Sequence, residues 1–194
     1  MQEPEGHRHV DPQLPDRLAR MGSELRLGLV DEGYDLAVRI ARLPSSSLVS
    51  RQLTSTRLIL CASPEYLRRH GTPSHPSELA RHAVASYTLL AMGEYWQFEG
   101  PDGPLGVKVL PVMRSNSGDT CCAAALQHRG IVLQPSFLVG AHLESGALVE
   151  VLPKYRSIEL GVYAVYPSRK HLTPKVRVLV DFLVEAFRTR PGSG

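Results

Sequence analysis

The sequence predicts an α/β fold with parallel strands, organised as two consecutive α/β units. Short apolar runs typical of buried strands alternate with helical patterns along the 194 residues. Residues 115–139 combine a polar helix cap, a helix, a short buried strand and a second helix opened by a proline-serine pair. The second unit starts near Cys61 and the chain returns near Tyr163, so it crosses between the units twice. Two such crossings are typical of a hinge, and ligands favour the crevice between lobes of this kind.

The N-terminal part of the chain contains the weakest patterns. Residues 1–22 are polar and carry prolines at positions 4, 12 and 15, which predicts a disordered tail. A short helix is expected over residues 23–34, with Gly33 at its end. A strand follows at residues 36–40, then a loop at 43–47 and extended segments at 48–53 and 57–62.

The triplet Ser63-Pro64-Glu65 is a strong helix start, because it supplies a serine cap, a proline at the first helical position and an acid in the first turn. Gly71 ends this helix, and residues 76–79 open another short one. Strands are expected at residues 83–87, 95–98 and 107–113. The glycines and prolines of residues 100–106 form the turn before the last of these strands.

The second half of the chain begins with the helix expected at residues 121–129, which Gly130 closes, and the strand at 131–135. Strands at 148–152 and 160–166 follow. The last element is the clearest helix, capped by Thr173 and with Pro174 at its first position. Its apolar residues form one stripe: Val176, Leu179, Val180, Leu183 and Phe187.

The cap at residues 115–120 is the strongest candidate for a binding site. A helix start presents free backbone N–H groups and the positive end of the helix dipole, so it suits a carboxylate or another anion. The strand at 131–135 should end at the same edge of a parallel sheet. The candidate effector-binding residues are therefore Ser115, Asn116, Ser117 and Gly118, with Pro135, Ser136 and Phe137 opposite them. A plain helix cap and an ordinary strand-to-helix corner are the alternative interpretations of these two segments.

Composition and motifs narrow the class of protein. A net charge of +3, without a long basic run, does not by itself indicate nucleic-acid binding. No signal peptide or membrane span is recognisable, which favours a cytoplasmic protein with no membrane contact. The sequence contains no nucleophile elbow, phosphate loop or zinc-protease motif, so we expect no enzyme, no catalytic residues and no cofactor.

Cysteine and histidine usage gives no further site. The three cysteines, at positions 61, 121 and 122, lack the spacing of a disulfide framework and are expected to be buried small residues. A reactive thiol near a helix start is the alternative. The eight histidines show no metal-binding spacing, and His7 and His9 fall in the polar tail, so no metal site is expected.

Seven segments in register resemble the effector-binding domain of LysR-type transcriptional regulators. The resemblance spans residues 23–188, and its segments are residues 30–40, 43–48, 60–67, 96–98, 115–118, 130–139 and 161–169. Each segment alone is weakly specific, whereas all seven in the same order are highly specific.

The resemblance implies two Rossmann-like lobes with the architecture of periplasmic-binding proteins of type II, and a small-molecule effector held between them. Residues 23–61 with 163–190 would form lobe one, and residues 62–162 lobe two. Arg39 and Ile40 could face the cleft, although Arg39 could instead pair with a structural acid. Four residues would lie at the hinge: Cys61, Ala62, Tyr163 and Tyr166.

The resemblance also implies a homodimer or tetramer and a winged helix-turn-helix that reads DNA. No such motif can be placed in this chain, and the first strand and helix of lobe one are not recognisable. We therefore expect an N-terminally truncated regulator with no DNA contact of its own, an incomplete lobe one and weakened oligomerisation. Two alternatives are a stand-alone solute-binding protein and a non-functional regulator that acts through mixed dimers.

Overall fold

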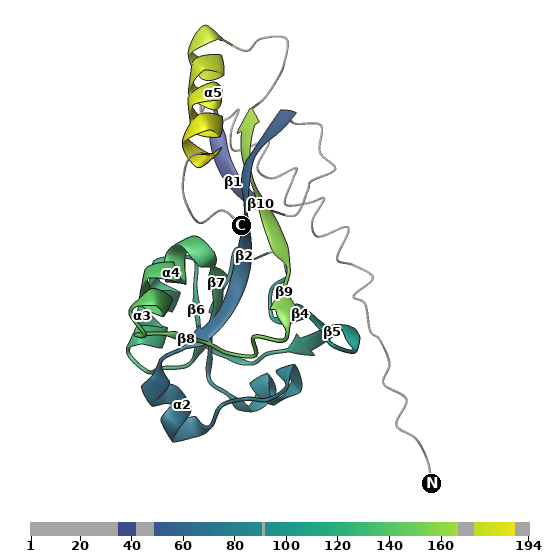
Figure 1. The fold of residues 1–194 in the computed structure, drawn as a ribbon, viewed down its shortest axis with the longest axis vertical. Helices are drawn as coiled ribbons and strands as arrows, with labels where there is room; N and C mark the ends of the chain where they lie inside the picture. The colour runs from purple at the N-terminus through teal and green to yellow at the C-terminus, as the bar shows by residue number, and fades with distance from the viewer. Residues whose placement is uncertain (1–34, 42–48, 91, 167–172, 189–194) are drawn as a thin grey trace. The chain divides into compact units, whose positions relative to one another are not determined.

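The computed structural model describes residues 35–41, 49–90, 92–166 and 173–188 (Figure 1). The expected tail at 1–22, helix at 23–34 and loop at 43–47 lie outside these ranges. Two compact units are present. Unit 1 is Leu58–Ile158, and unit 2 comprises the described residues up to Arg57 and from Glu159 onward. The predicted lobe boundaries, at 61/62 and 162/163, stay a prediction.

Unit 1 is built on a mixed sheet. Its strands are the C-terminal part of β2 (Val49–Ala62), β7 (Ile131–Pro135), β3 (Val84–Tyr87) and β6 (Pro111–Ser115), in that order. Strands β7, β3 and β6 run parallel, whereas β2 runs antiparallel to β7 and also pairs with β8 (Val149–Glu150). The expected parallel sheet is thus confirmed for three strands.

Helices α3 (Gly118–Leu126) and α4 (Ser136–Glu144) pack against this sheet and against each other. The apolar side chains between helices and strands form the core of the unit. Its buried members are Ile59, Cys61, Ala85, Cys121, Cys122, Ala125, Val132, Val139 and Leu148. Ile59 and Cys61, alternate residues of β2, both reach this core, as the period of two of a strand requires.

A second, three-stranded sheet in unit 1 corrects one expectation. It has the order β5 (Gly103–Lys108), β4 (Tyr95–Gly100), β9 (Arg156–Ser157). The single strand expected at 107–113 is wrong, because the chain leaves β5 at Lys108 and enters β6 of the larger sheet at Pro111. The expected turn is also shorter, since β4 and β5 pair up to Gly100 and Gly103. The pairing of strands in space therefore determines both where β5 ends and β6 begins and how long the turn between β4 and β5 is.

The start and end of α2 (Pro64–His70) agree with the sequence pattern. The Ser63 side chain accepts a hydrogen bond from the Tyr66 N–H, Pro64 is the first helical residue, and Gly71 follows the helix with φ of 83°. The next short helix, η1 (Pro76–Arg81), is a 3-10 helix that also begins at a proline. These local signals predict structure well because the groups that satisfy each helix end lie within a few residues.

The end of α3 differs from the expectation. His128, not Gly130, adopts the left-handed conformation after the helix, with φ of 61°. The N–H of His128 donates to Ala125 O and that of Arg129 to Ala124 O, which closes the helix. Gly130 is required for another reason: a Cβ there would lie 2.5 Å from the carbonyl oxygen of Ala83.

Unit 2 contains an antiparallel sheet in the order β1 (Ala37–Ala41), β10 (Glu159–Tyr166) and the N-terminal part of β2. The expected parallel pairing is wrong here. Local alternation of strands and helices does not specify how strands more than a hundred residues apart pair. The two expected extended segments at 48–53 and 57–62 form one strand, β2.

Helix α5 (Pro174–Arg188) packs its apolar stripe on the sheet of unit 2. Val176 and Val180 are buried against residues of β2 and β10. Leu179 is 44% exposed and does not belong to the buried stripe, which is a correction. Val184 packs there instead, because positions 176, 180 and 184 are spaced by four residues and lie on one face.

Candidate functional site

The two segments selected from sequence leave the same edge of the unit 1 sheet. Ser115 ends β6 and Pro135 ends β7, and both strands run parallel to β3 between them. Tyr87, the last residue of β3, is the register partner of Ser115. We call this region the α3–α4 edge; it comprises Ser115, Asn116, Ser117 and Gly118 together with Pro135, Ser136 and Phe137.

Ser117 organises the first turn of α3. Its Oγ accepts the N–H of Thr120 at 3.3 Å, and its own N–H donates to Ser115 Oγ at 3.1 Å. The N–H groups of Gly118 and Asp119 have no partner among the described residues, as is usual for the first positions of a helix. Ser115, Ser117 and Gly118 are half-buried and Asn116 is exposed. This turn therefore presents backbone donors with hydroxyl and amide groups beside them.

Helix α4 begins beside α3 from the same edge. Pro135 precedes it without a side-chain cap hydrogen bond. Pro135 is buried, Ser136 is half-buried and Phe137 is 61% exposed. Two helices of nine residues each thus direct their N-termini, which carry partial positive charge, to one edge of the sheet. The structure brings all seven residues of the α3–α4 edge to one edge of unit 1.

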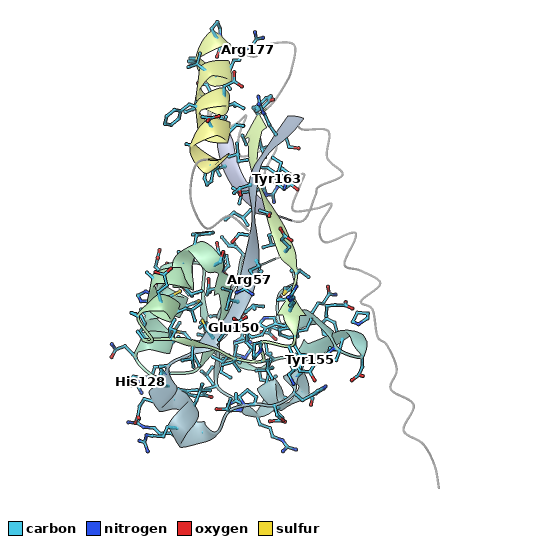
Figure 2. All side chains as sticks on the ribbon, in the orientation of Figure 1. Arg57, His128, Glu150, Tyr155, Tyr163 and Arg177 are labelled. Atoms are coloured by element: carbon cyan, nitrogen blue, oxygen red, sulfur yellow. The ribbon has the colours of Figure 1, made fainter. Side chains whose placement is uncertain are left out.

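The other residues selected from sequence lie elsewhere. Arg39 and Ile40 are on β1 of unit 2, and partial burial lowers the pKa of the Arg39 guanidinium. Of the expected hinge residues, Cys61 and Ala62 end β2 in unit 1 and are buried. Tyr163 and Tyr166 lie on β10 of unit 2, where Figure 2 labels Tyr163. Their roles at a cleft or hinge stay predictions.

The three cysteines lie together in the core of unit 1 and are buried. Burial raises the pKa of the Cys61 thiol to about 12 and that of Cys122 to about 11, and it also raises the pKa of Cys121. A thiol near α3 with a lowered pKa, the alternative left open from sequence, is therefore contradicted. Removal of the thiols from water dominates over their place near a helix start.

We expect all three thiols to react slowly with a disulfide reagent such as DTNB in the native protein at pH 8. Both the low thiolate fraction and the burial oppose the reaction. The control is the same protein unfolded in guanidinium chloride, where all three thiols should react rapidly. Rapid stoichiometric modification of one thiol in the native protein would contradict these burial and pKa assignments.

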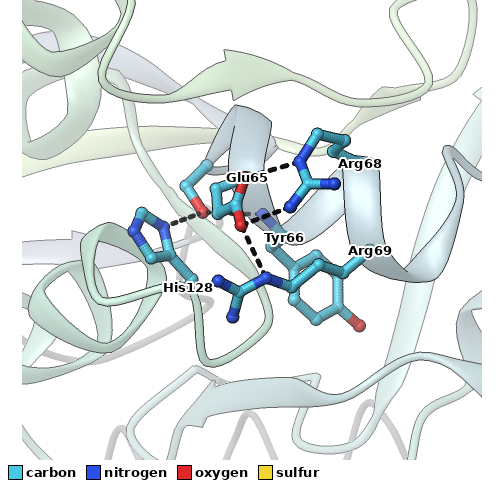
Figure 3. A network of polar contacts seen from close by, with 6 residues as sticks. Glu65, Tyr66, Arg68, Arg69 and His128 are labelled. Carbon is cyan, nitrogen blue, oxygen red and sulfur yellow. Dashed lines mark hydrogen bonds and ion pairs between the residues drawn. The ribbon is translucent and has the colours of Figure 1, made fainter.

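A polar network at the opposite edge of unit 1 was not recognised from the sequence (Figure 3). Ser63 Oγ lies 2.8 Å from His128 Nδ1 and also accepts the N–H of Tyr66. Nearby, hydrogen bonds from Arg68 and then Arg69 lower the pKa of the Glu65 carboxyl to about 2.

A serine beside a histidine could suggest a nucleophile and its base. Ser63, however, is only 1% exposed and caps α2 through its hydroxyl. The hydrogen bond to His128 joins α2 to the end of α3, so we assign this pair a structural role. The two residues are 65 positions apart in sequence, which is why no local pattern revealed them.

Gly118 of the α3–α4 edge and Gln134, which precedes that edge in β7, have properties that no sequence pattern indicated. The side chain of Gln134 is fully buried, and neither its Oε1 nor its Nε2 has a hydrogen-bond partner among the described residues. A Cβ on Gly118 would lie 3.1 Å from Gln134 Oε1 and 2.6 Å from Leu138 Cδ1. The only available signal was the position of a glutamine within an otherwise apolar strand, Ile131–Pro135.

Among the described residues, no group of three or more His, Cys, Asp or Glu side chains could hold a metal ion. His7 and His9 lie outside the described part. Within the same part of the chain, no helix is both long enough and apolar enough to cross a membrane.

The family model described as the LysR substrate binding domain matches residues 6–188, so the match begins within the segment 1–22 that was expected to be a tail. The HTH-type transcriptional regulator DmlR of Escherichia coli is 36% identical over 162 residues, which cover 82% of this chain and 52% of DmlR. The HTH-type transcriptional regulator CrgA of Neisseria meningitidis is 34% identical over 170 residues, covering 87% of this chain and 56% of CrgA.

Solved structures agree with these relatives. The regulatory domain of CrgA superposes with a TM-score of 0.71 at 29% identity, covering 92% of this chain and 95% of that domain. Full-length AphB of Vibrio cholerae, a virulence activator, gives a TM-score of 0.69 at 29% identity, covering 79% of this chain and 52% of AphB. The chain spans about half the length of the curated relatives it matches.

These structures have the periplasmic-binding-protein type II fold. The curated relatives named above are transcriptional regulators rather than enzymes. The chain therefore belongs to the LysR substrate-binding domain family and is the effector-binding domain of a LysR-type regulator.

Proposed function

We propose that the α3–α4 edge binds the acidic group of a small-molecule effector, a carboxylate or another anion. The observation that carries this proposal is the pair of helix N-termini at one sheet edge, where the N–H groups of Gly118 and Asp119 are available beside Ser115 and Ser117. These N–H groups can donate hydrogen bonds to an anion without any rearrangement of the backbone.

The first turn of α3 also contains an acid, and its effect has to be weighed. Asp119 is exposed, so its repulsion of a bound carboxylate is screened by water and amounts to about 1 kcal/mol at 4 Å. A hydrogen bond to a charged group contributes about 1.5–3 kcal/mol. Two N–H bonds from the first turn therefore outweigh the repulsion by Asp119.

In the whole regulator, effector binding would act by shifting the populations of different arrangements of the oligomer. LysR-type regulators bind small-molecule effectors and form oligomers. An effector that binds one arrangement of the oligomer better than another changes their ratio, and with it the transcription of DNA bound by the regulator's other domain. Such a regulator acts in the cytoplasm, where its DNA lies.

The test is binding of a panel of carboxylates, measured by ligand-observed NMR on the whole chain and on Ser117→Ala. We expect at least one acid to bind, and Ser117→Ala to weaken that binding about tenfold because the first turn loses its hydroxyl and its order.

The matched control is Ser63→Ala, which also removes a helix-capping serine from unit 1. Ser63 follows β2, and β2 runs antiparallel to β7, so Ser63 lies at the opposite edge of the sheet. Acid binding should be the same in this variant as in the unmodified chain. An equal loss in both variants, or no binding of any acid, would contradict the proposed site.

A further inference from the structure

Gln134 carries a buried amide that no described residue pairs with, at the point where β7 meets the α3–α4 edge. Its side chain is 0% exposed, and both amide atoms lack hydrogen bonds to described residues. Buried polar groups in native proteins are nearly always paired, and an exception calls for a cause such as a ligand. Leu133 and Pro135, its neighbours in β7, are also buried, so nothing about the strand itself requires a polar residue here.

The amide is directed at the first turn of α3. Gln134 Oε1 lies 3.1 Å from the position that a Cβ on Gly118 would occupy, and Leu138 Cδ1 lies 2.6 Å from it. Gly118 itself is half-buried. The absence of a side chain on Gly118 thus lets Leu138 and the Gln134 amide pack directly against the first turn of α3, close to its backbone N–H groups.

We propose that Gln134 is a specificity-determining residue of this site, and that the effector carries a hydroxyl group beside its acidic group. This inference rests on the proposed function, because the acidic group has to be held by the first turn of α3. An amide offers both an acceptor and a donor. A hydroxyl can use both, whereas an acid with only apolar substituents leaves the amide unpaired.

The consequence is discrimination between acids that differ by one hydroxyl. Sites that contain a buried hydrogen-bonding group reject analogues that lack the matching group, because the group of the site stays unpaired. The carboxylate contributes equally for both acids of such a pair. The difference in affinity between the two acids of a pair therefore measures the contribution of Gln134. The affinity of the acid without the hydroxyl measures the contribution of the first turn of α3.

The experiment compares lactate with propionate and mandelate with phenylacetate, on the whole chain and on Gln134→Leu. Leucine is similar in volume and apolar. In the unmodified chain we expect the hydroxy acid of at least one pair to bind about tenfold more tightly than its partner. In Gln134→Leu the hydroxy acid should lose this advantage, while the affinity of the acid without the hydroxyl stays within about twofold.

Four outcomes would overturn the inference, and they are distinguishable. Equal binding of both acids of each pair, or discrimination that survives in Gln134→Leu, removes the role of Gln134 but leaves the acid site intact. No binding of these four acids to the unmodified chain contradicts this inference, and it contradicts the acid site as well if no acid of the wider carboxylate panel binds. A clear fall in the melting temperature of Gln134→Leu would show that the amide has a structural partner.

Discussion

Replacement of Gly130 by alanine is expected to destabilise unit 1 by about 3 kcal/mol. The added Cβ would lie 2.5 Å from the carbonyl oxygen and 2.9 Å from the carbonyl carbon of Ala83. Both are backbone atoms, so neither can move away as a flexible side chain can. The same oxygen accepts the N–H of Ile131 at 2.9 Å, where the parallel pairing of β3 and β7 begins. The contact can be relieved only by separating these central strands.

Urea unfolding monitored by circular dichroism measures this effect. Gly140→Ala is the matched control, because no atom lies within 4 Å of a Cβ at that position in α4. Alanine is favoured over glycine inside a helix by about 1 kcal/mol, so this variant should be as stable as the unmodified chain or more stable. A Gly130→Ala protein with an unchanged unfolding midpoint would contradict the close approach of Gly130 to Ala83.

Truncation of Leu148 to alanine is expected to cost about 2–5 kcal/mol of unfolding free energy. Leu148 is fully buried in the core between the unit 1 sheet and its helices, where it packs with residues of β2, α3, β7 and α4. The loss combines the transfer free energy of the removed methyl groups with the cavity that they leave. Its N–H also donates to His142 O at 3.0 Å, which limits how far the backbone can relax into the cavity.

Val112→Ala is the control for Leu148→Ala, because it also shortens an aliphatic side chain but at an exposed position. Val112 lies on β6 and is 69% exposed, so we expect a change within about 0.5 kcal/mol. Similar losses for Leu148→Ala and Val112→Ala would show that the region around Leu148 is not the rigid core described above.

Local chemistry made several elements predictable. The Ser63-Pro64 start of α2, the Ser117 cap of α3 and the apolar strand before α4 each depend on groups within a few residues of one another. The α3–α4 edge was predictable for the same reason, together with the rule that parallel strands end at the same edge of a sheet.

Contacts between distant residues could not be read in the same way. The antiparallel pairing of β1 with β10, the link between Ser63 and His128, and the exposure of Leu179 all depend on partners far along the chain. Gly130 illustrates the difference. The sequence marks it as a helix terminator, but its role is to admit the carbonyl of Ala83, which lies 47 positions earlier in the sequence.

The amino-acid sequence by itself determined the family, the order of most elements and the helix start that serves as the candidate site, because these follow from local patterns in register. Only the tertiary structure decided which strands pair antiparallel, that the buried thiols have raised pKa values, and that the Gln134 amide, close to Gly118, has no hydrogen-bond partner among the described residues. Burial and pairing are properties of the packed chain, since they depend on which distant residues exclude water from a side chain.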